Sequence, residues 1–201
     1  MKTIFFCLTA TALLGAITAC SDSSDSSNTK PPTEAGVGQA YTNAAYCMTA
    51  LASGDPAKAH RFALATIAGG NSTVTFEMTP LLSGATKLDT AQTIGSIVTL
   101  ADIAVAKSGA FDYVSPTGKI IEIPGEANPI SGSRIMLERL DLSGKIDSSA
   151  PKYCGSFVAK IIEPAALKGS DVAATCLFYK LSPGDMLPVA TAADYAACSS
   201  N

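Results

Sequence analysis

The stretch YCGSFVAKIIEPAALKGSDVAATCLFYKL, residues 153–181, contains two strand-like runs around a turn. YCGSFVAKIIE and DVAATCLFYKL are rich in β-branched, aromatic and aliphatic residues, which favour strands. PAALKGS between them carries the proline and glycine that are typical of a turn. The pattern therefore predicts a β-hairpin, the basic unit of an antiparallel sheet.

The residues before this hairpin give the same kind of signal. In TVTFEMTPL, residues 73–81, the apolar Val74, Phe76 and Met78 alternate with threonines and a glutamate, as in a half-buried strand. Three further strand-sized stretches, separated by glycine and proline turns, lie at 93–109, 109–125 and 133–146. Because no amphipathic helix separates these runs, we predict a mainly β fold, an antiparallel β-sandwich or small barrel. A short C-terminal helix is expected over 191–198.

The start of this domain has a helical spacing. Apolar residues three and four apart occur at Val37, Tyr41, Ala44, Met48 and Leu51. This spacing predicts a short N-terminal helix over 37–51.

The next segment, 57–68, fits two structures. Asp55 as a cap and Pro56 in the first turn favour a helix. The alternation of Phe62 and Leu64 with smaller residues, and the turn that follows, favour a strand. We take the strand as the better interpretation.

Residues 37–201 contain four cysteines, and an even number in an exported chain predicts two disulfides. Three pairings are possible. A hairpin centred near Ala165 places Cys154 directly opposite Cys176, at a separation that a disulfide spans. That register favours Cys154–Cys176 and leaves Cys47 to pair with Cys198, which would join the two ends of the domain.

The N-terminus has the features of an export signal. Lys2 precedes an uncharged, largely apolar run that ends at Ala19, which is the order found in secretory signals. Cys20 follows at once, and SDSSDSSNTKPPTEAG, residues 21–36, contains no large apolar residue. Such a composition favours a flexible linker, because it buries too little apolar surface to offset the entropy of ordering.

Ile17-Thr18-Ala19-Cys20 resembles the lipobox of bacterial lipoproteins. The resemblance implies cleavage before Cys20, a diacylglyceryl thioether on its sulfur, and acylation of the new amino group. In enteric bacteria an aspartate directly after the lipidated cysteine retains a lipoprotein at the inner membrane, whereas this chain has Ser21 there. The alternative is an ordinary signal peptide followed by a structural cysteine.

The sequence therefore predicts three parts: a lipoprotein signal peptide over 1–19, a lipidated Cys20 with a flexible linker over 20–36, and a single β-rich domain over 37–201. The expected location is the bacterial cell envelope, with the lipid anchored in the outer membrane.

Composition limits the partners. Charged residues make up 15% of the chain, and without Lys2 there are 13 basic against 17 acidic residues. No basic run is interleaved with aromatic residues, so nucleic acid is not an expected partner. The expected contact with the membrane is through the N-terminal lipid.

Few residues suggest catalysis, and we predict no catalytic site. His60 is the only histidine and no GxSxG motif is present, so a serine hydrolase would lack its usual parts. We expect His60 to face solvent. The carboxylate pairs Glu122 with Glu126 and Glu138 with Asp141 are expected to be exposed strand charges, the second pair pointing to opposite faces of a straight strand.

Metal and cofactor signals are equally weak, and we predict neither. Asp141, Ser143, Gly144 and Asp147 have the composition of a hairpin turn that is able to hold calcium, but Ser and Gly are also ordinary turn residues. The absence of a CxxC motif argues against a zinc cluster.

Three functions fit these features. The first is a lipid-anchored envelope protein with a non-catalytic binding or structural domain. The second is a carrier that holds a small apolar ligand in a β-barrel or cleft, because stretches such as 135–142 are apolar on both faces. The third is a hydrolase with an unrecognised site. The sequence does not identify a ligand or protein partner.

Overall fold

A computed structural model describes residues 41–70 and 72–199 of the chain. These residues form nine strands in one antiparallel sheet and one α-helix. The strands are β1 (Asn43–Thr49), β2 (His60–Ala68), β3 (Thr73–Pro80), β4 (Val98–Ala104), β5 (Ala110–Tyr113), β6 (Ile121–Ile123), β7 (Ile135–Lys145), β8 (Lys152–Glu163) and β9 (Asp171–Lys180). The helix is α1 (Ala192–Ser199). The predicted mainly β fold is confirmed, as is the C-terminal helix.

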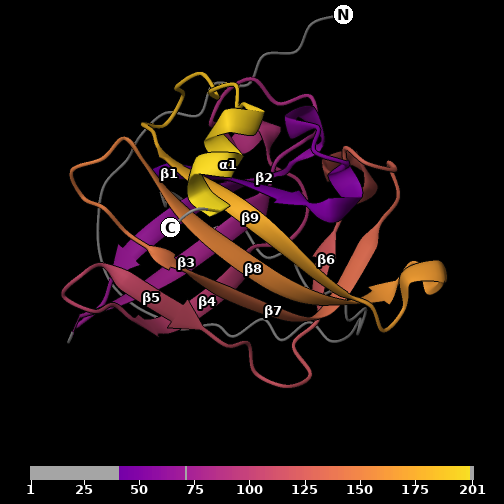
Figure 1. The fold of residues 1–201 in the computed structure, drawn as a ribbon, viewed down its shortest axis with the longest axis horizontal. Helices are drawn as coiled ribbons and strands as arrows, with labels where there is room; N and C mark the ends of the chain where they lie inside the picture. Colours follow the sequence, from indigo (N-terminus) through magenta and orange to yellow (C-terminus); the bar gives the residue numbers. More distant parts are fainter. Residues whose placement is uncertain (1–40, 71, 200–201) are drawn as a thin grey trace, which may run out of the picture. The chain divides into compact units, whose positions relative to one another are not determined.

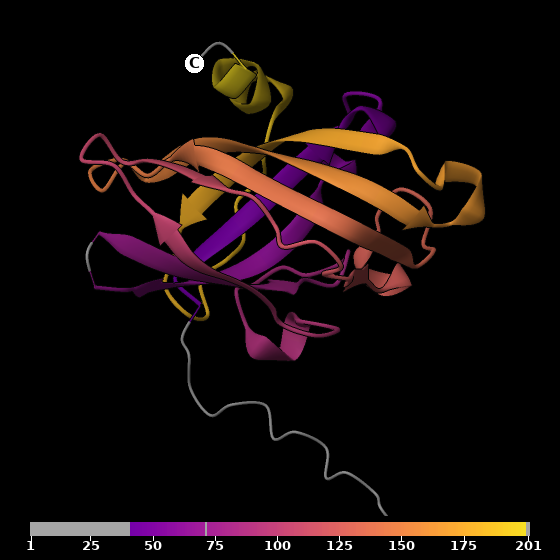
Figure 2. The ribbon, with the colours of Figure 1, turned by 90° about the horizontal axis from the view of Figure 1, so that it is seen from below.

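The sheet curls into a nearly closed barrel. Its strand order is β4-β3-β2-β1-β9-β8-β7-β5, and β6 pairs with another part of β7 (Figure 1). An isolated bridge between Val105, just after β4, and Phe111 of β5 brings the first and last strands together. Figure 2 shows the consequence, with the orange strands β7 and β8 lying across from the purple and magenta strands β2 to β4. Most of the apolar core fills the space between them.

The segment predicted as an N-terminal helix is a strand. Residues 41–51, the described part of that segment, contain β1 and the start of a 3₁₀ turn. β1 lies between β2 and β9 and is buried on both faces, so its residues do not alternate between apolar and polar. Without that alternation, a short apolar run has no period that separates strand from helix. The helix prediction was therefore wrong.

The ambiguous segment 57–68 contains both predicted features. Asp55 accepts a hydrogen bond from the Ala57 backbone N–H at 3.0 Å and caps a single 3₁₀ turn, Pro56–Lys58. The chain then enters β2, so the preferred interpretation as a strand is confirmed.

The hairpin at 153–181 is present, but its register differs by one residue from the prediction. β8 and β9 pair Cys154 with Leu177 and Gly155 with Cys176. Neighbouring residues of a strand point to opposite faces, so this one-residue shift puts the two cysteines on opposite sides of the sheet. They are unable to bond to each other.

All four cysteines in the described residues form disulfides, as predicted, but the pairing was wrong. Cys47 bonds to Cys176, its direct partner in the β1–β9 register, with a Cα–Cα distance of 4.1 Å. Cys154 bonds to Cys198 in α1, with a Cα–Cα distance of 5.4 Å. One bridge therefore lies inside the barrel, and the other fastens the helix to the outside.

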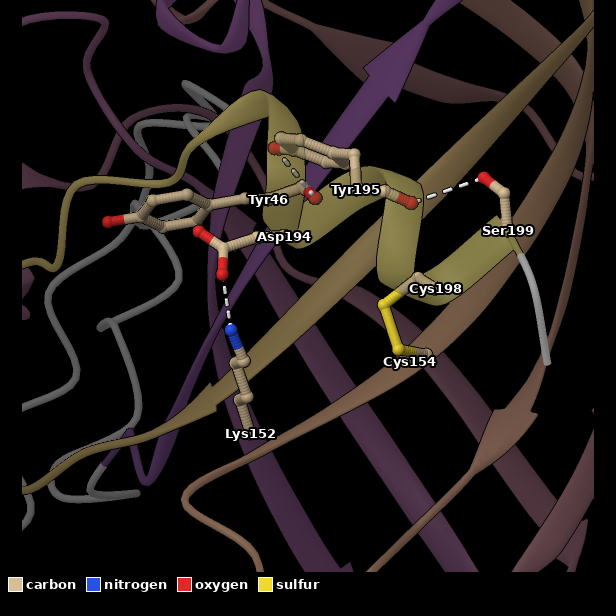
Figure 3. The surroundings of a disulfide bond; sticks show 7 residues. All are labelled: Tyr46, Lys152, Cys154, Asp194, Tyr195, Cys198 and Ser199. Atoms are coloured by element: carbon tan, nitrogen blue, oxygen red, sulfur yellow. Dashed lines mark hydrogen bonds and ion pairs between the residues drawn. A yellow bond between two sulfur atoms is a disulfide. The ribbon is translucent and has the colours of Figure 1, made fainter.

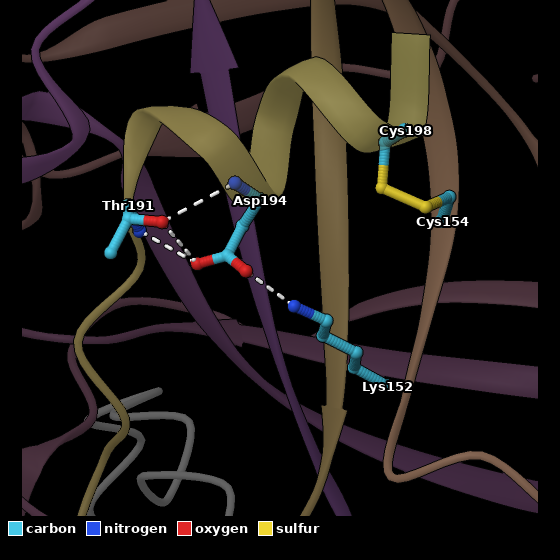
Figure 4. A network of polar contacts seen from close by, with 5 residues as sticks. All are labelled: Lys152, Cys154, Thr191, Asp194 and Cys198. Carbon is cyan, nitrogen blue, oxygen red and sulfur yellow. Dashed lines mark hydrogen bonds and ion pairs between the residues drawn. A yellow bond between two sulfur atoms is a disulfide. The ribbon is translucent and has the colours of Figure 1, made fainter. Parts of the chain in front are cut away.

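The helix α1 covers a second apolar cluster on the outer face of the sheet. Tyr195 is buried there, and its hydroxyl donates to the Tyr46 carbonyl at 3.3 Å (Figure 3). At the first turn, the Thr191 hydroxyl and backbone N–H donate to Asp194, whose own N–H donates back to Thr191 (Figure 4). This reciprocal cap satisfies helix N–H groups that would otherwise lack partners. Lys152 pairs with Asp194, and its hydrogen bond is the main cause that lowers the pKa of Asp194 to about 2.

Two glycines make room for aromatic rings in the barrel. Gly144 of β7 and Gly155 of β8 are directly paired. A Cβ atom at Gly144 would lie 2.9 Å from the Phe111 ring, and one at Gly155 would lie 2.8 Å from the Phe178 ring. Ser143-Gly144, predicted as a turn, is therefore part of a strand, where the glycine allows close packing.

The predicted signal peptide, linker and Cys20 lie outside the described residues. Within the compact unit 38–201 lie all of the described strands, both core clusters and both disulfides.

We expect non-reducing peptide mapping to recover Cys47 linked to Cys176 and Cys154 linked to Cys198. Replacing both Cys47 and Cys176 by alanine should lower the free energy of unfolding by ~5 kcal/mol, because that bridge spans 129 residues of chain. Replacing Cys154 and Cys198 should cost ~4 kcal/mol for a span of 44 residues. Urea unfolding measures both values, and recovery of a Cys154–Cys176 peptide would contradict the observed register.

Candidate functional site

A cavity of about 350 Å³ opens at the end of the barrel where β8 passes into β9 through the 3₁₀ turn η5 (Ala165–Leu167). Its walls come from β1, β2, β6, β7, β8, β9 and the loop after β6. The walls are mainly apolar: Ile123, Ile135, Leu137, Phe157, Ile161 and Val172. Several of these side chains belong to the barrel core, so the cavity is an unfilled part of that core. Its volume is within the range of small-molecule sites.

The exposure of the lining residues shows which end of the cavity faces solvent. Leu51, Ser131, Ser133, Pro164 and Ala166 are exposed and surround the mouth. The side chains at the other end are buried. A molecule that entered the mouth would therefore move from solvent into an apolar interior.

Two polar side chains reach the buried end because of strand geometry. In the β1–β2 register, His60 lies directly opposite Cys47, so the two side chains share a face. Thr49 follows Cys47 by two positions and points the same way. Cys47 belongs to the core inside the barrel, so Thr49 and His60 also face the interior.

Both side chains are buried, and each carries one polar atom without a hydrogen-bond partner. The exposed fraction is 6% for Thr49 and 5% for His60. Thr49 Oγ1 and His60 Nε2 are the two buried side-chain polar atoms without a partner among the residues that the structure describes. Leaving such a group unpaired costs about 1–3 kcal/mol, and buried polar groups in native proteins are nearly always paired. Two unpaired atoms on the wall of one cavity therefore suggest that the cavity accepts a polar group.

The site is uncharged near neutral pH. Burial lowers the pKa of His60 below its ordinary value of 6.5, and the Asn128 side chain opposes this shift in part. A neutral imidazole carries one hydrogen-bond donor and one acceptor. The described residues that line the cavity include no Asp, Glu, Lys or Arg.

Asn128 shapes the wall through hydrogen bonds within its own loop. Its amide nitrogen donates to Ser131 Oγ at 2.8 Å and to the Ser133 carbonyl at 2.7 Å. Its carbonyl oxygen accepts from the backbone N–H groups of Ile130 and Ser131. This network fixes the loop beside the mouth, and Thr49 Oγ1 and His60 Nε2 are the unpaired buried polar atoms of the described lining.

The prediction that His60 faces solvent was wrong. The alanines around it, taken as a sign of an exposed element, are buried, and Ala59 and Ala63 belong to the apolar cluster on the outer face of the sheet. Sequence reasoning missed Thr49 and Asn128. Had 43–49 been interpreted as a strand, its alternation would have placed Thr49 on the same face as Cys47.

The carboxylates Glu138 and Asp141 do not form a pair. β7 is not straight, because its register shifts between Leu137 and Arg139. Glu138 pairs with Lys160 at 3.0 Å, and Asp141 accepts from Arg139 Nε at 2.6 Å. Each carboxylate thus has its own cation.

The other candidate residues are also apart from the cavity. Glu122 and Glu126 are exposed on β6 and on the 3₁₀ turn that follows it. The suggested calcium turn does not form, because Ser143 and Gly144 lie within β7. Asp147 instead accepts hydrogen bonds from its own turn. In the described part of the chain, His, Cys, Asp and Glu side chains form no group of three that is able to hold a metal ion.

Comparison of the chain with protein-family models, with curated proteins and with solved structures gave no match. Within residues 41–70 and 72–199, no helix has the length and apolar character needed to span a membrane.

The environment of His60 predicts a pH dependence of stability. A histidine whose pKa is lowered by folding binds its proton more readily in the unfolded state, so stability falls as pH decreases below about 6.5. We expect the free energy of unfolding to fall by up to ~1.4 kcal/mol per pH unit until the folded-state pKa is reached.

Urea unfolding between pH 7.5 and 5.5 measures this slope. Because the chain has one histidine, the slope should be nearly flat in His60→Gln. Equal slopes in the wild type and in this variant would show that the buried imidazole is not their cause.

Proposed function

We propose that this chain is a lipid-anchored envelope protein whose barrel binds a small apolar molecule without chemically changing it. The observation that carries the proposal is the cavity at the end of β8, with its apolar wall and the two unpaired polar atoms of Thr49 and His60. Pockets of this kind, mainly apolar with a few convergent polar groups, are typical of small-molecule sites in barrels.

The polar groups support binding more than catalysis. A histidine that acts as a base is normally oriented by a third group, as in a Ser-His-Asp triad. No carboxylate lines the cavity among the described residues, so this third group is missing. The free-energy cost of an unpaired buried imidazole is better explained by a hydrogen bond that a ligand would supply. This choice favours the carrier among the three functions that the sequence suggests, and makes the hydrolase the weakest.

The anchor is supported by the sequence alone. Ile17-Thr18-Ala19-Cys20 stands where an apolar run meets a polar linker, as in a lipoprotein signal. Burying a lipid chain in the membrane contributes a free energy of ~0.8 kcal/mol per methylene, so two or more chains hold a protein stably on a membrane. The linker of 16 residues after Cys20 would reach about 50 Å when extended. In this proposal the domain is held near the outer membrane, where apolar molecules are concentrated.

The binding proposal predicts that residues 38–201, exported to the periplasm and purified, take up the uncharged dye Nile red. In Ala159→Phe the new ring occupies the cavity, and we expect the dye affinity to fall at least about tenfold, the equivalent of ~1.4 kcal/mol. Ala173→Phe is the matched control, because Ala173 is exposed on the neighbouring strand and does not line the cavity. Fluorescence titration measures the affinity.

An added ring in a core costs about 1–3 kcal/mol of stability, so Ala159→Phe can misfold. A second pair of variants therefore adds the bulk at exposed positions. Ala166→Trp places the bulk at the exposed mouth, and Ala165→Trp places it on the adjacent residue outside the lining. Dye binding that is equal in all folded variants, or absent from the wild type, would refute the proposed site.

The anchor proposal predicts that the full chain, expressed in a bacterium fed an alkyne fatty acid, becomes labelled. Cys20→Ser should abolish the label and move the protein out of the membrane fraction, because the thiol carries the diacylglyceryl group. Lys2→Arg is the control, since it keeps the charge of the signal. A labelled Cys20→Ser protein would contradict lipidation at this residue.

A further inference from the structure

The cavity also indicates which chemical class of ligand it selects. We propose that its ligand is an uncharged apolar alcohol, whose hydroxyl lies at the buried end between Thr49 and His60 and whose apolar part extends toward the mouth at η5. This inference rests on the proposed binding function and adds the polarity, charge and orientation of the ligand.

Position supports one shared partner for the two side chains. Cys47 and His60 are directly opposed on β1 and β2, and Thr49 is two residues further along β1. Thr49 and His60 are therefore diagonal neighbours on the inner face, with Cα atoms about 7–8 Å apart. One small group between side chains at that spacing is able to reach both of them.

Hydrogen-bond capacity favours a hydroxyl. The Thr49 hydroxyl donates one hydrogen bond and also accepts, and Nε2 of a neutral His60 either donates or accepts. A ligand hydroxyl has one donor and two acceptor sites, so it satisfies both atoms whichever tautomer His60 adopts. An ether or ketone oxygen only accepts, and it would leave the acceptor form of Nε2 unpaired.

Charge argues against acids and amines. The described lining carries no Lys or Arg to pair with a carboxylate, and no Asp or Glu to pair with an ammonium group. The ion pair at the mouth, Arg134 with Glu163 at 2.5 Å, joins partners that are about half exposed and already neutralise each other. Burying an unpaired charge costs far more than a hydrogen bond returns. A fatty acid anion is therefore expected to bind poorly.

The direction of the ligand follows from the wall. Beyond Thr49 and His60, the surface toward the mouth is formed by aliphatic and aromatic side chains, including Leu137, Phe157 and Ile161. An apolar chain that lies along these residues is removed from water over its whole length, which supplies most of the binding free energy. The hydroxyl then adds selectivity, because a hydrocarbon leaves both polar atoms unpaired and an ether leaves the acceptor form of Nε2 unpaired.

The test is a set of ligands of nearly equal size, measured on residues 38–201 at pH 7.4 by displacement of Nile red and by calorimetry. The set consists of octan-1-ol, its isomer 1-methoxyheptane, octanoate and octylammonium. We expect octan-1-ol to bind about tenfold more tightly than the ether, as for one hydrogen bond to buried groups, and more tightly than either ion.

Two variants assign that preference to the proposed groups. Thr49→Val keeps the shape of the side chain and removes its hydroxyl, and His60→Leu removes the imidazole. Each should reduce the preference for octan-1-ol over the ether to about threefold or less. Circular dichroism and thermal unfolding establish that each variant is folded. If one is not, the comparison of ligands on the wild type still decides the class.

The outcomes separate this inference from the proposed function. Dye binding with equal affinity for the alcohol, the ether and the ions would overturn the alcohol class and leave the apolar site standing. Stronger binding of octanoate or octylammonium than of octan-1-ol would also overturn it. Failure of the dye and of every aliphatic compound to bind would overturn the proposed function, and this inference with it.

Discussion

The position of β1 between β2 and β9 is the constraint on which the rest of the structure depends. Its two neighbours fix its register on both sides, so each of its side chains has one possible face. Cys47 points into the barrel and meets Cys176, while Tyr46 points outward and contacts the segment that carries α1. The same alternation brings Thr49 to the cavity. One central strand thus joins the inner core, the outer cluster and the candidate site.

Prediction from the sequence succeeded where a strand has one polar face. The segment 73–81 alternates, and it is a strand with Phe76 and Met78 buried. Prediction failed for β1, because a strand covered on both faces shows no alternation. It failed again for the disulfides, since hairpin length predicts which strands pair but not their register to one residue. This one-residue shift in register determines which sulfur atoms face each other.

The candidate site was harder to foresee than the fold, for a physical reason. Its walls come from six strands and a loop that lie far apart in the sequence, so no local motif records it. Most of the lining is ordinary aliphatic core, which has the same composition whether a barrel is filled or hollow. The predicted carrier function rested on strands that are apolar on both faces, and the structure adds a specific cavity to that general argument. His60 was noticed because it is the only histidine, but its burial depends on pairing across strands that the sequence does not display.

The bridge between Cys47 and Cys176 affects when the folded domain is completed. It lies directly beside the residues that present Thr49 and His60, and such bridges form in oxidising compartments and not in a reducing cytoplasm. In the proposed envelope location, the bridge that joins the strands behind the cavity forms only after export. On that proposal, the bond between two sulfur atoms ties the fastening of the barrel wall to the compartment that the protein has reached.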